Sequence, residues 1–472
     1  MPPFQVRSRP PVVRLVNAFE RPFENAVATA RTCYSAGGPV TPAQVSGDGL
    51  DDARREKRAL ARDRLARSIY RAGHHTTFQH PHFQFTLENV SRQFLWTFLH
   101  AHPFYNSEQV SQRYVAVKPE EATIPDLGGE AQAVYEEALR AQGEAYHRLD
   151  AMLKPVAAEL FYGRFPGKRK NRERHDADVA KRTQEVARYV LPLATFAYLY
   201  HTVSALTLFR YRRVMEQLDA PAETRAVVEA MAQAALALDP LLDRVLEDPV
   251  PLEETPEWRH FVAFAPARAS GEAARFRERF DASLEGRVSK LVDWKPAAEV
   301  VLAESVRETL GLTPERLSDD EAIRAVLDPA RLSWFGEALN VGEHSKLARA
   351  LHHPHYTFRK RLSHTADSQD QRHRMTPGSR PILLAHLDDR PDYETPEMVR
   401  LDPAAQALYD ETMRRSYDAA RRLRALGVSD EWAAYVLPNA TRVRFTESGD
   451  LMALHHKFAM RLCYNAQEEI WR

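Results

Sequence analysis

HPHFQF (His80–Phe85) recurs as HPHYTF (His353–Phe358), 273 residues further along the chain. Two other segments recur in the same order: VVRLV at 12–16 as VSKLV at 288–292, and ARYVLP at 187–192 as AAYVLP at 433–438. Their spacings of 276 and 246 residues are far longer than the period of a solenoid and indicate duplication of a whole domain. The sequence therefore predicts two related halves, residues 1–246 and 287–472, joined by a proline-rich and acidic connector at 247–286.

Both halves mix strand-like and helix-like patterns. The segment 12–16 is typical of a buried strand, and apolar and polar residues alternate at 80–90. Apolar residues three and four apart at 130–160 predict a long amphipathic helix. Further helices are expected at 24–34, 60–70, after Ser91, at 187–192 and at 222–246, and loops at the polar stretch 106–114 and the basic stretch 164–175.

The composition is that of an ordinary globular protein, with 44% hydrophobic residues, 28% charged residues and a formal net charge of +0. This balance gives no reason to expect nucleic acid or a membrane as a bulk partner. Two cysteines, Cys33 and Cys463, are too few for a disulfide framework or a cysteine-only zinc site. No apolar run approaches 18 residues, so we expect a cytoplasmic protein.

Two HPH pairs, His80 with His82 and His353 with His355, offer imidazoles that could ligate a metal ion. Residues two apart on a strand do share a face. No carboxylate or cysteine stands at ligand spacing beside them, so a structural role is the simpler interpretation and no metal site is expected.

The segment QDQRHR (Gln369–Arg374) has the clearest chemistry. Arg372 and Arg374 flank His373, and their guanidinium groups can hold a phosphate or an anionic heterocycle through bidentate hydrogen bonds. The cluster is ambiguous by itself, because a solvated basic turn has the same composition. The basic stretch 164–174 is equally ambiguous: it could contact nucleic acid, but a solvated loop fits the zero net charge better.

GHHTTFQHPHFQFTLENVSR (73–92), followed by SQRYV (111–115), resembles the flavin-dependent thymidylate synthases. That family carries GHxSxxEHxxFxFxIxxVSR, then QxxRHR, SxRY, ARxxLP and an arginine shortly before AQxEIR, and the resemblance covers most of both halves. It implies an α/β (α+β) fold with a sheet and long helices in each half, the two halves forming a pseudo-dimer. It also implies FAD as cofactor and reductive methylation of dUMP to dTMP, with methylenetetrahydrofolate and NADPH as co-substrates.

Neither half carries the whole family pattern. The first half keeps the phosphate loop and the arginine of ARxxLP: Ser111, Gln112, Arg113 and Arg188. The second half keeps the glutamine, the RHR run and the late arginine: Gln369, Arg372, His373, Arg374 and Arg461. The losses are complementary. The first half has His100, His102 and Met215 where the family has arginines, and the second half has Ala434 in ARxxLP.

The resemblance therefore implies one composite nucleotide site and one emptied site. Arg461 would be the catalytic residue, stabilising negative charge on the pyrimidine. Gln369 and Arg372 would hold the base and sugar, and the residues kept by the first half would hold the phosphate. His373 and Arg374, with Arg372 and His353, would contact FAD. His100 and His102 would be neutral at pH 7 and hold an anion poorly, so we expect them to be structural.

One departure concerns the flavin. The family's Asn-x-Arg pair aligns with Ser204 and Leu206 in the first half and with Asp450 and Met452 in the second, so FAD binding is less secure than nucleotide binding. Two alternatives follow: a non-catalytic nucleotide- or flavin-binding scaffold of the same fold, and a nucleic-acid binder that uses 164–174. The expected partners are dUMP or a related nucleotide and a second copy of the chain, in a homodimer equivalent to the family's homotetramer.

Overall fold

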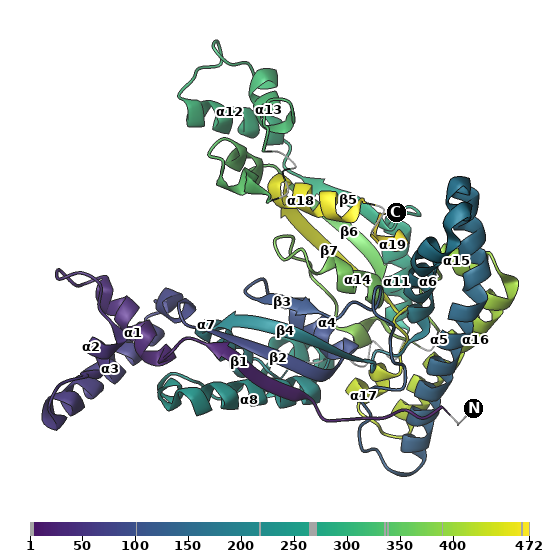
Figure 1. Ribbon diagram of the computed structural model, residues 1–472, viewed down its shortest axis with the longest axis horizontal. Coiled ribbons are helices and arrows are strands. Elements are labelled where there is room, and N and C mark those ends of the chain that lie inside the picture. The colour runs from purple at the N-terminus through teal and green to yellow at the C-terminus, as the bar shows by residue number, and fades with distance from the viewer. Residues whose placement is uncertain are drawn as a thin grey trace.

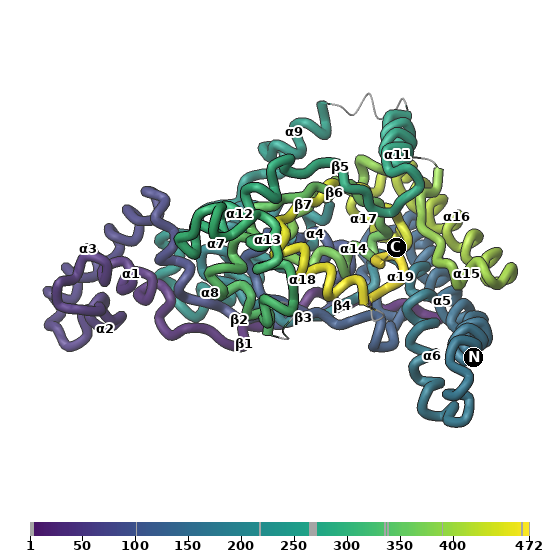
Figure 2. The backbone as a smooth tube through the Cα atoms, turned by 90° about the horizontal axis from the view of Figure 1, so that it is seen from above, coloured from purple at the N-terminus to yellow at the C-terminus, as the bar shows by residue number. Residues whose placement is uncertain are grey.

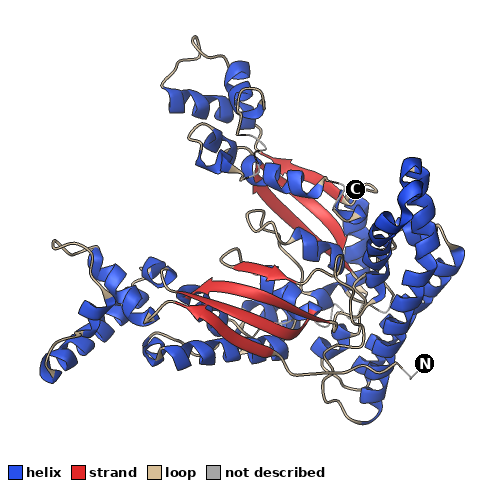
Figure 3. Ribbon diagram, in the orientation of Figure 1, coloured by secondary structure: helices blue, strands red, loops and turns tan. Residues whose placement is uncertain are grey.

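Two antiparallel sheets organise the chain, one in each half (Figure 1, Figure 3). This computed structural model describes residues 4–100, 102–216, 219–263, 271–334, 337, 339–388, 390–463 and 466–471. The first sheet has the order β1-β2-β4-β3 and the second the order β5-β6-β7. The strands are β1 Val12–Ala18, β2 His82–Ser91, β3 Asn106–Gln109, β4 Phe196–Ser204, β5 Ser289–Trp294, β6 His355–Ser363 and β7 Arg442–Asp450.

The recurring sequence segments occupy equivalent places in the two sheets. β2 pairs with β1 and β4, and β6 pairs in the same antiparallel manner with β5 and β7. The alternation in β2 buries Phe83, Phe85 and Leu87 completely, against a core to which helix α8 (Pro221–Leu238) contributes. The predicted α+β fold of two related halves is therefore confirmed.

Helices surround both sheets (Figure 3). Between the first two strands of each sheet, inserted helices form an arm that projects from it: α12 with α13 in the second half (Figure 1) and α1 to α3 in the first half (Figure 1, Figure 2). The other bounds are α1 Pro22–Thr32, α2 Pro42–Ser46, α3 Asp52–Arg71, α4 Arg92–His100, α5 Gly129–Arg164, α6 Arg172–Ala187, α7 Ala205–Arg213, α9 Pro256–Ala263, α11 Glu272–Ser283, α12 Ala298–Leu310, α13 Asp319–Leu327, α14 His364–Asp370, α15 Glu397–Arg400, α16 Pro403–Ala425, α17 Asp430–Tyr435, α18 Leu451–Arg461 and α19 Glu468–Trp471.

The two halves join through the recurring VLP segments, which run antiparallel to each other. Leu193 N donates to Leu437 O (2.9 Å), and Asn439 N donates to Leu191 O (2.8 Å). A core cluster that contains residues of both halves packs around this junction. The long helices α5 and α16 also lie side by side, and Arg415 of α16 pairs with Glu137 of α5 at 3.1 Å.

A pair of buried glutamates repeats the same contacts on both sides of the junction. Glu223 accepts hydrogen bonds from Ser91 N (2.7 Å) and Ser91 Oγ (2.5 Å) in its own half and from the Tyr435 hydroxyl of the other half. Glu469 does the same with Ser363 and, at 2.7 Å, with the Tyr189 hydroxyl. These reciprocal contacts are those of a two-fold dimer, so the halves form the predicted pseudo-dimer.

Three local expectations need correction. The stretch 106–114 is not entirely loop, because β3 pairs there with β4 through backbone groups that a side-chain pattern does not report. The stretch 164–175 is largely helical, with a 3-10 helix at Pro166–Asn171 followed by α6. At 187–192 the helix is only the 3-10 turn Arg188–Val190. The connector contains α9 and α11, and its residues 264–270 lie outside the described part of the chain.

No helix in the described part of the chain is both long enough and apolar enough to span a membrane.

Candidate nucleotide site between the two halves

Two capped helices of the second half bring Gln369 and Arg461 together. Ser363 caps α14 by accepting from Ala366 N, and Asp450 caps α18 by accepting from Ala453 N at 2.8 Å. Gln369 lies in the last turn of α14, and Arg461 ends α18. Asp450 stands at the asparagine position of the missing Asn-x-Arg pair, so this side chain now serves as a helix cap.

The Gln369 amide connects arginines of both halves. With its orientation assigned from the surrounding donors, its oxygen accepts from Arg461 Nη1 at 3.2 Å and from Arg113 Nη1 at 3.1 Å. Arg113 belongs to the SQRY loop of the first half, 256 residues before Gln369. It is buried and also pairs with Glu185. The structure thus brings together three residues that the sequence assigned to one composite site.

Arg188 of the first half is held by the last segment of the second. Its Nη2 donates to Gln467 Oε1 (2.5 Å), and the amide nitrogen of Gln467 donates to the Tyr189 hydroxyl. Gln467 belongs to the AQEEI segment, which follows Arg461 in the chain. This contact therefore places Arg188 against the side of the junction that the second half forms and to which Arg461 also belongs.

Four arginines near this junction form a cationic cluster. Arg92, Arg188, Arg372 and Arg461 form no ion pair among the described residues. Desolvation, together with repulsion from Arg372 and Arg113, lowers the pKa of Arg461 to about 10, although Asp370 opposes the shift. The Nε atoms of Arg92, Arg188 and Arg461 are buried and have no hydrogen-bond partner in the described part of the chain. Buried cations of this kind are costly, and a bound anion would offset that cost.

Arg92 is the member of the cluster that the sequence did not single out. It is 5% exposed, and its Nη1 donates to Gln109 Oε1 at 2.9 Å. Desolvation and repulsion from Arg188 and Arg372 lower its pKa to about 9. A signal was available, because the VSR motif of the first half keeps this arginine whereas the second half has His364 in the same position.

Arg372 and Arg374 line a cavity of about 350 Å³ that abuts β3. Arg374 Nη1 donates to Pro103 O at 3.1 Å, and its guanidinium lies over the Tyr105 ring. Gln371 also lines this cavity, and both of its amide atoms are buried without a partner among the described residues. The cavity therefore carries two arginines and one carboxylate, Glu108, and has unused hydrogen-bonding groups.

The two histidines assigned to the cofactor lie in different environments. Desolvation and the nearby charges of Arg461 and Lys457 lower the pKa of His373 to about 3, so its ring is neutral at pH 7. His353 is exposed, and its carbonyl accepts from Lys295 Nζ at 3.0 Å. Among the described residues, no hydrogen bond or ring contact joins His353 to the RHR run.

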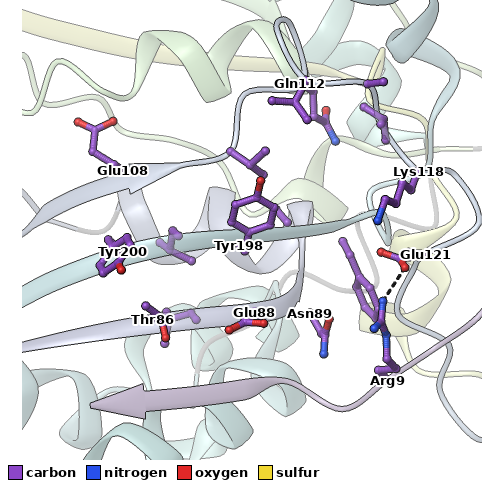
Figure 4. A pocket seen from close by; sticks show the side chains of 18 residues that line it. Arg9, Thr86, Glu88, Asn89, Glu108, Gln112, Lys118, Glu121, Tyr198 and Tyr200 are labelled. Atoms are coloured by element: carbon purple, nitrogen blue, oxygen red, sulfur yellow. Dashed lines mark hydrogen bonds and ion pairs between the residues drawn. The ribbon is translucent and has the colours of Figure 1, made fainter. Parts of the chain in front are cut away.

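In the first half, the positions equivalent to the RHR arginines and to Arg461 carry no charge at pH 7. Desolvation and nearby arginines lower the pKa of His100 and of His102 to about 4, so both are neutral at pH 7 as expected. Met215, at the position of the late arginine, lies in the apolar core. Gln112, which the resemblance assigns to the nucleotide, is buried and borders a separate cavity on the first sheet (Figure 4).

A second difference between the halves concerns three buried positions. In the second half, Lys457 Nζ pairs with Glu447 (2.6 Å) and Asp370 (2.9 Å), and all three side chains are at most 3% exposed. The equivalent positions of the first half follow from two correspondences: the cap Ser204 corresponds to the cap Asp450, and His100 corresponds to Arg372. Counted from these, Lys457, Glu447 and Asp370 correspond to Tyr211, His201 and Phe98. These three rings pack on one another, and the His201 ring lies 3.0 Å from the Tyr211 hydroxyl. The half that keeps Arg461 therefore has a buried ionic cluster at these positions, and the other half has an aromatic cluster.

Comparisons with known proteins agree with this architecture. The family model described as "Thymidylate synthase complementing protein" matches residues 14–241 and 290–472. The flavin-dependent thymidylate synthase of Nitratidesulfovibrio vulgaris is 27% identical over 226 residues, which cover 47% of this chain and 80% of that protein. The Halobacterium salinarum enzyme of the same name is 26% identical over 257 residues, covering 47% and 90%.

Among solved structures, the UMP/dUMP methylase PolB from Streptomyces cacaoi bound with 5-Br dUMP matches with 20% identity and a TM-score of 0.35, covering 51% of this chain and 96% of that one. Most of each sequence relative corresponds to less than half of this chain, as a duplication requires. With family matches in both halves, the chain belongs to the thymidylate synthase complementing proteins, the flavin-dependent thymidylate synthases, as a tandem duplication of the family domain.

Proposed function

We propose that the chain methylates dUMP reductively to dTMP in one composite site, with methylenetetrahydrofolate and NADPH as co-substrates. Family membership supports a thymidylate synthase-like function. The observation that carries the composite site is the Gln369 oxygen, which accepts from Arg113 of the first half and from Arg461 of the second. The phosphate and the pyrimidine anion of dUMP would supply the negative charge that the arginine cluster lacks.

The residues divide naturally between the two ends of the nucleotide. Arg113 and Arg188, with the Ser111 hydroxyl, would hold the phosphate from the side of the first half, and Arg92 is close enough to their charges to join them. Gln369 and Arg372 would hold the base and sugar. Arg461 would stabilise the negative charge that develops on the pyrimidine, because a desolvated, preorganised cation acts most strongly on such charge.

The cavity beside the RHR run fits part of the FAD molecule that the family uses. Arg372 and Arg374 supply positive charge for its pyrophosphate, and the unpartnered Gln371 amide offers a donor and an acceptor to the edge of a ring. His373, neutral at pH 7, would lie beside the cofactor without competing for a proton. FAD would carry reducing equivalents from NADPH to the transferred methylene group.

The assay for this proposal is tritium release from dUMP labelled at C5, with NADPH and methylenetetrahydrofolate, using the full chain reconstituted with FAD. We expect turnover and a yellow protein that absorbs near 450 nm. A colourless protein that gains thermal stability with dUMP, but releases no tritium, would establish the non-catalytic scaffold instead. Sedimentation analysis would show whether two chains associate, as expected if the pseudo-dimer stands for half of the family homotetramer.

Arg92→Gln should change ligand affinity and protein stability in opposite directions. We expect dUMP to bind about tenfold more weakly or worse, because a charge-assisted hydrogen bond is worth roughly 1.5–3 kcal/mol. The ligand-free protein should melt at the same or a higher temperature, since the substitution removes a buried and unpaired cation. Calorimetric titration and a thermal melt test the two effects.

A graded control is Gln109→Leu, which removes the acceptor of Arg92 and keeps the charge. Its loss of dUMP affinity should be smaller than that of Arg92→Gln. Unchanged dUMP affinity in Arg92→Gln would remove Arg92 from the site.

A further inference from the structure

The two arms that project from the sheets carry opposite charge. Residues 22–71, which contain α1 to α3, have nine basic and six acidic side chains, a formal charge of +3. Residues 298–327, which contain α12 and α13, have three arginines and seven carboxylates, a formal charge of −4. Both arms are inserted at the same place in their half, and the whole chain has a net charge of +0. Two related arms have therefore diverged in charge.

A cavity of about 530 Å³ lies in the basic arm, between α3 and the ends of α1 and α2. Val45 and Leu65 supply part of its apolar lining. Five cationic side chains also line it: Arg31, Arg54, Lys57, Arg58 and Arg62. Carboxylates outside the lining pair with Arg54 and Arg62, and the other three cations form no ion pair in the described part of the chain. The cavity therefore suits an apolar group that carries negative charge.

Helix α12 of the acidic arm presents such a group. Val300, Val301, Glu304 and Glu308 share one side of the helix by their spacing, and all four are exposed. The opposite side of α12 packs against α13 in a small core of its own. Glu304 pairs with Arg307 at 2.8 Å, whereas Glu308 forms no ion pair among the described residues. Exposed apolar side chains flanked by carboxylates are typical of a helix face that docks in a cationic groove.

The arms of one chain project in different directions, so the complement of the basic arm has to come from another molecule (Figure 1). In a two-fold dimer, each arm meets either its own copy or the opposite arm of the other chain. The first arrangement places like charges together at both contacts, and the second pairs opposite charges twice. Like charges held together oppose association, so the charges of the arms favour the second arrangement.

We propose that α12 of one chain docks in the basic-arm cavity of a second chain. Val300 and Val301 would lie on the apolar lining, and Glu308 beside Lys57 and Arg58. The two-fold repeats this contact, so each chain both receives and supplies a helix. The resemblance implies a second copy of the chain but does not indicate which surfaces meet. The contact is independent of the methylation reaction.

Carbodiimide cross-linking of the full chain tests which arms meet. The reagent joins a lysine amine directly to a carboxylate, and Lys57 is the one lysine of residues 22–71. After unlabelled and isotope-labelled chains have exchanged subunits, we expect peptides of mixed label that join Lys57 to Glu304 or Glu308. A mixed-label link from Lys57 to a carboxylate of another basic arm would show that like arms meet, and the proposal would be wrong.

Charge reversal measures the contribution of the contact to dimerisation. Lys57→Glu should weaken the dimer about tenfold, because each dimer contains the altered contact twice. Adding Glu308→Lys to the same chain should restore most of the affinity, since opposite charges meet again. The matched control is Lys170→Glu, which reverses an exposed lysine outside both arms and should change the dissociation constant by less than about twofold. Sedimentation equilibrium measures all four proteins.

The substituted arm side chains are exposed, so the melting temperature should stay at the wild-type value. The proposal is wrong if the wild type is monomeric at about 0.1 mM, if Lys57→Glu associates as tightly as the wild type, or if Glu308→Lys fails to restore the affinity. A monomeric wild type that binds a single-stranded uridine oligonucleotide, and loses it in Lys57→Glu, would assign the basic arm to nucleic acid instead.

Discussion

Arg461→Ala and Arg188→Ala, one substitution in each half, should each weaken dUMP binding by about 100-fold or more. The two residues are 273 positions apart, yet Gln369 contacts Arg461 and Gln467 contacts Arg188 at the same junction. Each substitution removes a guanidinium group from a cluster whose other cations then hold the anion alone. Calorimetric titration with dUMP measures the loss, and tritium release should fall at least in proportion.

The matched control is Arg210→Ala. Arg210 is an exposed arginine beside the emptied, pseudo-equivalent place in the first half, where its guanidinium lies over the Phe104 ring. Its loss should leave dUMP affinity within about twofold of the wild type. If Arg188→Ala binds dUMP normally while Arg461→Ala does not, the site is built from the second half alone.

Mixing the two defective proteins gives a sharper test of where the site is assembled. Arg188 and Arg461 lie at the same junction within one chain, so every site in a mixed dimer would still lack one of these two arginines. We therefore expect no recovery of activity after Arg461→Ala and Arg188→Ala chains are unfolded together and refolded. Recovery toward a quarter or more of the wild-type activity would show instead that the walls come from different chains.

Lys457→Met should destabilise the second half by about 3–5 kcal/mol, the usual cost of removing one partner from a buried ionic cluster. Lys457 Nζ pairs with Glu447 and Asp370, and Lys360 pairs with both of these carboxylates. The pKa of Asp370 lies well below its usual range, because the charges of Lys360, Lys457 and Arg380 outweigh the desolvation that would raise it. Without Lys457, the two buried carboxylates would keep Lys360 and the more distant Arg380, whose Nη2 lies 3.6 Å from Asp370 and 3.9 Å from Glu447. Chemical unfolding of wild type and variant measures the difference.

The first half supplies the controls for this prediction. Tyr211→Phe, at the equivalent position, removes one hydrogen bond from an aromatic cluster and should cost only about 1 kcal/mol. Replacing the ionic group by its first-half equivalents (Lys360→Leu, Asp370→Phe, Glu447→His and Lys457→Tyr) should recover most of the stability lost in Lys457→Met. A Lys457→Met protein as stable as the wild type would mean that the cluster contributes nothing to folding.

Much of the architecture could be predicted from local patterns. The alternation around Phe83 and Phe85, the helical spacing at 130–160 and the recurrence of HPH and VLP depend only on residues close in sequence, and the structure confirms the elements that they predict. The complementary loss of motif residues also predicted which half supplies each set of residues in the composite site. Where prediction failed, as at β3 and at 164–175, backbone pairing or a short 3-10 turn decided the structure without a side-chain signature.

What the sequence by itself determined is the duplication, the mixture of strands and helices in each half and the residue types available for an anion site. Only the tertiary structure decided that Arg92 joins the cluster without a carboxylate partner among the described residues, that Gln112 borders a separate cavity and that Lys457 pairs with Asp370, 87 positions away. The physical reason is that pairing, burial and repulsion depend on distances across the junction of the two halves. Sequence spacing reports side-chain direction within an element, but it does not report which charges meet when two elements pack.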